Sequence, residues 1–88
     1  MNTLAKQVHN ITPDSVQLLF ADGSSVSIQM RSAEFFQEAF QAEGTDEQGV
    51  VYRLVTDGED DPLVAGRQLE SGEWEAVGPI AEVSRADS

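Results

Sequence analysis

Four carboxylates stand within five consecutive residues of this chain, the densest group of oxygen ligands it offers to a cation. They are Asp57, Glu59, Asp60 and Asp61. A calcium loop of the EF-hand type needs oxygens at alternating positions, a glycine at the sixth, a glutamate at the twelfth and a helix on each side. Here Gly58 is the second residue, the flanking residues are typical of strands, and Pro62 closes the run. We therefore expect a solvated loop and no metal site; a cation bound by these carboxylates is the alternative.

Catalytic chemistry has few candidate residues. His9 is the single histidine, so a catalytic triad would have to combine it with Asp14 or Asp22 and a nearby serine. No Gly-x-Ser-x-Gly sequence surrounds a serine, and the absence of cysteine excludes thiolate nucleophiles and cysteine-based metal sites. Paired carboxylates would need a deep cleft, for which 88 residues leave little room. We expect no catalytic residue, no cofactor and no enzymatic activity; a small enzyme without a recognisable motif is the second alternative.

The charge is strongly one-sided. Aspartate and glutamate number 16 against 5 lysines and arginines, for a net charge of −11, and Lys6 is the only lysine. Since affinity for phosphate backbones rests on clustered basic residues, direct binding of nucleic acid is not expected.

Two interpretations of this acidity remain open. Self-repulsion destabilises such a chain in dilute buffer, whereas salt screens the repulsion and the charge keeps the protein soluble, as in halophilic organisms. The alternative is an acidic surface that imitates a nucleic acid and inhibits a basic protein. Composition favours salt adaptation but does not separate the two.

Length and hydropathy predict one small domain, 1–88, with frayed ends at about 1–5 and 84–88. The first ten residues do not resemble an apolar signal segment, and no run approaches the roughly eighteen apolar residues of a membrane helix. We expect a cytoplasmic protein without a membrane partner.

The clearest local pattern is a hairpin over residues 15–30, which alternates polar and apolar residues on both sides of Asp22-Gly23. A two-residue turn would mix polar and apolar groups on each face. A three-residue loop, 21–23, instead puts four apolar residues on one face: Val16, Leu18, Val26 and Ile28. Because a slip of one residue reverses every side chain, we predict the three-residue loop with Gly23 left-handed.

Other segments complete the expected fold. Residues 7–11 suggest a short strand that a turn ends at 12–15, and residues 50–56 a strand rich in branched side chains. Between them, residues 32–43 predict a helix that Ser32 caps and Gly44 ends. Phe36, Ala39, Phe40 and Glu43 fall along one side of it, with Phe35 beside them.

A second hairpin is predicted over residues 63–78, with its turn at Ser71-Gly72. Its expected register pairs Leu69 with Trp74, Arg67 with Ala76, Ala65 with Gly78 and Leu63 with Ile80. The sum is an α+β domain, in ββ(β)-α-βββ order, whose mainly antiparallel sheet of five or six strands carries one helix on one face.

One apolar patch is the candidate interaction surface. Trp74 lies between Glu73 and Glu75, and with Tyr52 and Leu69 it would form a patch with a charged rim. A packing role for Trp74 against Leu69 is the other interpretation. The sheet face without the helix, carrying Val51 and Val55, also needs cover. These residues predict a small acidic binding or regulatory module whose partner is another protein or a second copy of the chain.

Overall fold

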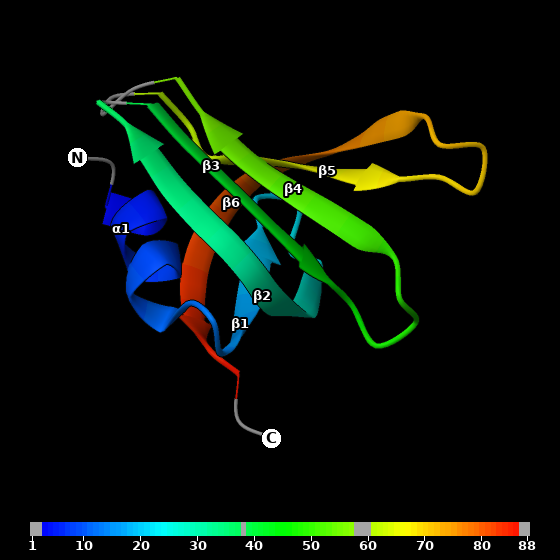
Figure 1. Ribbon diagram of the computed structural model, residues 1–88, viewed down its shortest axis with the longest axis horizontal. Coiled ribbons are helices and arrows are strands. Elements are labelled where there is room, and N and C mark those ends of the chain that lie inside the picture. The colour runs from blue at the N-terminus through cyan, green and yellow to red at the C-terminus, as the bar shows by residue number, and fades with distance from the viewer. Residues whose placement is uncertain (1–2, 38, 58–60, 87–88) are drawn as a thin grey trace.

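The computed structural model shows six strands that form a closed antiparallel barrel, with one helix packed beside it (Figure 1). It describes residues 3–37, 39–57 and 61–86. The elements in chain order are α1 (Thr3–Ile11), β1 (Ser15–Phe20), β2 (Ser25–Phe36), β3 (Ala39–Thr45), β4 (Val51–Thr56), β5 (Val64–Gln68) and β6 (Trp74–Arg85).

The closed barrel contradicts the α+β fold predicted from the sequence. The sheet does not lie open with a helix on one face, because β6 pairs with β1 and joins the two ends of the strand order. The barrel closes because the two longest strands, β2 and β6, each pair with two neighbours. β2 pairs with β1 through its first half and with β3 through its second, and β6 divides itself between β5 and β1 in the same way. Each bends at a break in register, as strands at barrel corners do.

Three hairpins have a three-residue loop of the same kind, and the β1–β2 hairpin confirms the loop predicted at 21–23. β1 pairs Val16 with Ile28 and Leu18 with Val26, which requires the three-residue loop. In each hairpin the residue before the loop donates its amide to the residue after it, and a glycine with positive φ ends the loop. The loops are 21–23, 47–49 and 70–72, closed by Phe20 to Ser24, Asp46 to Val50 and Leu69 to Glu73 bonds of 2.8, 3.0 and 2.7 Å.

The helix predicted over residues 32–43 is wrong. This segment is the β2–β3 hairpin, in which Phe35 pairs with Phe40 and Ser32 with Glu43. A bulge between Met30 and Ser32 shifts the inward-facing positions by one residue, so the alternation of the strand is interrupted and the remaining spacing imitates a helix. Phe36, expected to be buried on that helix, is 54% exposed.

The only helix among the described residues replaces the strand predicted at 7–11. Leu4, Val8 and Ile11 recur at helical spacing, and Ala5 and Val8 are fully buried against the barrel. α1 packs mainly on β6. His9 contacts Phe35 at a ring-centroid distance of 5.4 Å. Within the described ranges, no helix is long and apolar enough to cross a membrane.

The predicted strand at 50–56 is confirmed as β4, and its inward side chains join the core. Leu54 is fully buried, and Tyr52 and Thr56 are nearly so. The core fills the barrel with alternating residues from all the strands and with side chains from α1. Its largest fully buried members are Phe40, Leu18, Ile28, Met30, Leu54, Leu63, Val8 and Val16.

The β1–β2 loop contains a carboxylate with a shifted pKa. The Ser24 hydroxyl donates to Asp22 Oδ1 at 2.6 Å and the Ser24 amide donates to the same oxygen at 2.9 Å. The hydroxyl bond first, and then the amide bond, lowers the pKa of Asp22 below its ordinary value.

We expect Ser24→Ala to raise the pKa of Asp22 toward its ordinary value, because the hydroxyl hydrogen bond, the largest cause of the lowering, would be lost. Since the pKa is depressed in the folded state, the stabilisation is present at neutral pH and is lost as the pH falls through the folded pKa. A carboxyl NMR titration of both proteins measures the shift. An unchanged pKa in Ser24→Ala would show that the hydroxyl bond is absent in solution.

Candidate functional site

The carboxylate run begins where β4 ends. Asp57 and Asp61 are exposed, and the Thr56 hydroxyl donates to the Asp61 carbonyl at 3.1 Å. Glu59 and Asp60 lie outside the described residues, so the expected solvated loop stays a prediction there. In the part of the chain that the structure describes, no group of three histidine, cysteine or acidic side chains is placed to hold a metal ion.

The residues considered for a catalytic triad lie in separate environments. His9 is exposed on α1 against Phe35. Asp14 forms an ion pair with Arg85 at 2.5 Å, and Asp22 accepts hydrogen bonds from Ser24 within its own loop. None of these described contacts joins a carboxylate to the imidazole.

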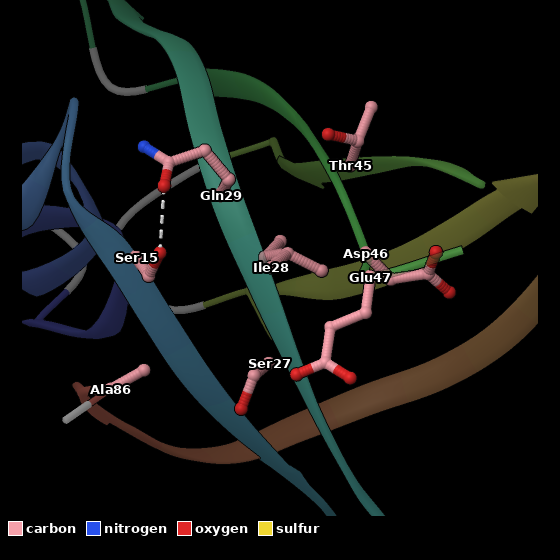
Figure 2. A pocket seen from close by; sticks show the side chains of 8 residues that line it. All are labelled: Ser15, Ser27, Ile28, Gln29, Thr45, Asp46, Glu47 and Ala86. Atoms are coloured by element: carbon pink, nitrogen blue, oxygen red, sulfur yellow. Dashed lines mark hydrogen bonds between the residues drawn. The ribbon is translucent and has the colours of Figure 1, made fainter. Parts of the chain in front are cut away.

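A shallow hollow of about 290 Å³ lies where β1, β2 and the β3–β4 loop meet. In Figure 2 the Glu47 carboxylate reaches toward Ser27, while Asp46 turns away. The Ser15 hydroxyl donates to Gln29 Oε1 at 2.8 Å. The lining contains serines and carboxylates but no histidine that could act as a base, so its chemistry is that of a hydrated polar surface.

The β5–β6 hairpin projects from the barrel, at the right of Figure 1. Its register near the turn differs from the prediction: Gln68, not Leu69, pairs with Trp74, and Glu75 pairs with Arg67. A bulge between Ala65 and Gly66 restores the predicted register beyond it, where Ala65 pairs with Gly78. Leu69 and Trp74 consequently lie on opposite faces of the hairpin and do not pack against each other.

Trp74 lies on the outside of the barrel, beside β5 and β4. The Arg53 guanidinium carbon is 4.4 Å from its ring centroid, a cation–π contact. The ring lies over Gly66, where a Cβ would be 3.9 Å from it, an ordinary contact distance. The Arg53 Nε atom is buried without a hydrogen-bond acceptor among the described residues. Trp74 still exposes 40% of its surface, so the stack fixes the ring without covering it.

Leu69 lies on the other face, beside an ion pair. Arg67 Nη2 contacts Glu75 Oε1 at 2.7 Å. The pKa of Arg67 is raised, first by the hydrogen bond with Glu75, then by the negative charge of Glu75, and then by a hydrogen bond with the Tyr52 side chain. Leu69 is 37% exposed and, with Arg67 and Tyr52, helps to line a hollow of about 200 Å³.

The structure therefore divides the predicted patch. Tyr52 is inside the barrel, Val51 and Val55 are half-buried on the outside of β4, and only Leu69 and Trp74 are exposed on the hairpin. Arg53 was not predicted from the sequence as the partner of Trp74, because their contact depends on β4 and β6 both pairing with β5.

A family model with the description "Domain of unknown function (DUF8072)" matches residues 1–88. No curated protein and no solved structure matches the chain.

Proposed function

We propose that this chain, which belongs to the DUF8072 family, is a small non-catalytic binding or regulatory module that acts through protein–protein contacts. The observation that carries the proposal is the β5–β6 hairpin, which projects from the barrel and exposes Leu69 and Trp74 on its two faces. Tryptophan held rigidly and half exposed is a favoured anchor in protein interfaces because it offers a large contact area at little entropic cost.

Charge indicates what kind of protein binds there. Residues 68–79 contain three glutamates and no lysine or arginine. Glu70, Glu73 and Glu75 are all exposed around the turn. A partner with a basic surface would therefore be attracted, whereas a second copy of the chain, with its own charge of −11, would be repelled at low salt.

The remaining acidity fits solvent adaptation better than imitation of a nucleic acid. Imitation would require rows of carboxylates on one side, whereas the exposed ones among the described residues lie on β2, on β6 and in five different connections between elements. They are Asp14, Asp22, Glu34, Glu47, Asp57, Asp61, Glu70, Glu73, Glu75 and Glu82. We accordingly propose a cytoplasmic protein of an organism that keeps high internal salt.

Site-specific photo-crosslinking in the native cells tests this function. A benzophenone amino acid at Leu69 should form adducts with a basic protein, and the same group at Gln17, exposed on β1, should not. Adding Trp74→Ala to the Leu69 variant should reduce the adducts about tenfold or more, as loss of an interface anchor does. Adducts of equal yield from Leu69 and Gln17, or adducts insensitive to Trp74→Ala, would contradict the proposal.

A further inference from the structure

One side of β6 is uncovered over its first residues. β5 pairs with β6 from Trp74 to Pro79, but β1 covers the opposite side only from Ile80 onward. The Ala21 amide donates to the Pro79 carbonyl at 3.1 Å, where the β1–β2 loop turns away. Within the described ranges, no strand pairs with that side of β6 from Trp74 to Val77, which we call the open edge.

The backbone groups of the open edge point outward. In an antiparallel pair, alternate residues direct both their N–H and C=O groups to the partner strand, and those between direct them away. The Leu69 amide donates to the Glu73 carbonyl at 2.7 Å, so Glu73, and two residues later Glu75, face β5. Trp74 and Ala76 therefore direct two donors and two acceptors into the open side.

Side chains leave this edge accessible. The Trp74 ring turns toward β5 and β4, over Gly66 and under Arg53, rather than across the edge. Ala76 is small and exposed. The register break and Pro79 limit the edge to about four residues, roughly 13 Å of strand.

We propose that the open edge receives an extended, lysine- or arginine-rich segment of a partner protein as an added strand. This rests on the proposed function, in which the hairpin is the binding surface. The added strand would exchange main-chain hydrogen bonds with Trp74 and Ala76, and its basic side chains would lie beside Glu73 and Glu75. A second copy would bring the same glutamates and is disfavoured. Salt screens this preference because Glu73 and Glu75 are exposed, so at high salt the main-chain hydrogen bonds supply the larger part of the affinity.

The probe is a capped octapeptide of alternating lysine and valine, titrated at the lowest potassium chloride concentration at which circular dichroism shows the native fold. Fluorescence of Trp74, the single tryptophan, reports binding. Two control peptides have the same sequence and charge. Each carries N-methyl groups at alternate residues, one along the first edge of the extended peptide and the other along the second, so each lacks the hydrogen-bond donors of one edge. We expect N-methylation on one of the two edges to weaken binding about tenfold or more, the loss of one or two hydrogen bonds. A glutamate–valine peptide should not bind.

Amide hydrogen exchange supplies the second measurement. The Trp74 and Ala76 amides should exchange rapidly in the free protein and become protected with the lysine–valine peptide. Ala76→Pro removes an outward donor without removing a bond to β5, and Ala76→Thr is its control, which retains the donor. Ala76→Pro should lose binding while Ala76→Thr keeps it.

Two results would overturn strand addition. If all the methylated peptides bind as well as the parent and the two amides stay unprotected, binding is by side chains alone, and the proposed function survives. If the parent peptide does not bind, the open edge does not take a basic strand; the crosslinking at Leu69 then decides the proposed function separately.

Discussion

Gly44→Ala should destabilise the barrel by about 3 kcal/mol, near the upper end for overpacking a core. A Cβ at Gly44 would lie 2.6 Å from the Gln29 carbonyl oxygen and 3.2 Å from the Met30 Cα atom. Both are backbone atoms of β2 at its bulge, so no side chain can rotate to relieve the contact. In a domain of this size, 3 kcal/mol lowers the melting temperature by roughly 15 °C. Thermal unfolding followed by circular dichroism measures the change.

Gly66→Ala is the matched control for that variant. Its Cβ would lie 3.5 Å from the Glu75 carbonyl oxygen and 3.9 Å from the Trp74 ring, ordinary contact distances. Both glycines are strand residues outside the left-handed region of φ, so the two variants differ mainly in what the added methyl group meets. Gly66→Ala should melt within a few degrees of the parent. Equal losses in the two variants would show that the close contact of β3 with the bulge of β2 does not exist.

Raising potassium chloride from 0.1 M to about 3 M should stabilise the fold by several kcal/mol, because screening is nearly complete at the upper concentration. With a net charge of −11 on a chain of 88 residues, self-repulsion is the largest destabilising force that salt can remove. The melting temperature should rise by about 10 °C or more. Circular dichroism gives the melting curves, and light scattering shows whether the chain stays monomeric.

The chloride series needs a control for effects of salt other than screening. A variant in which Glu34, Asp57 and Glu82, all exposed, become glutamine or asparagine lowers the charge without touching the core or the hairpin. It should be more stable than the parent at 0.1 M and show a smaller gain with salt. If the parent protein is equally stable at both salt concentrations, solvent adaptation is contradicted. Imitation of a nucleic acid then becomes the better explanation of the acidity.

The sequence predicted those parts of the fold that depend on neighbouring residues. Alternation around Asp22-Gly23 was sufficient for the register of the first hairpin, since only one loop length puts Leu18 opposite Val26. Closure of the barrel was beyond such patterns, because it joins Val16 with Arg85, residues at opposite ends of the chain. Bulges account for two other errors: one inserted residue makes the strand after Met30 resemble a helix, and another changes the partner of Trp74 from Leu69 to Gln68. The helix in place of the strand predicted at 7–11 has a different origin, since Leu4, Val8 and Ile11 recur at helical spacing.

The candidate site was predictable only in part for the same reason. The acidic surroundings of Trp74 and its place beside a turn are visible in the sequence. Its stack with Arg53 and the open edge of β6 depend on which strands are neighbours and where each pairing stops. The proposed binding by the hairpin rests on those two features.

The central claim, that the β5–β6 hairpin is the binding surface, is tested most directly by an NMR map of the backbone amides during titration with the lysine–valine peptide. We expect the largest shifts at residues 69–77, saturating together with the Trp74 fluorescence, and little change in α1 and the β2–β3 hairpin. The claim would be contradicted if the shifts were spread evenly over the acidic surface, or were largest at another site such as the β3–β4 loop.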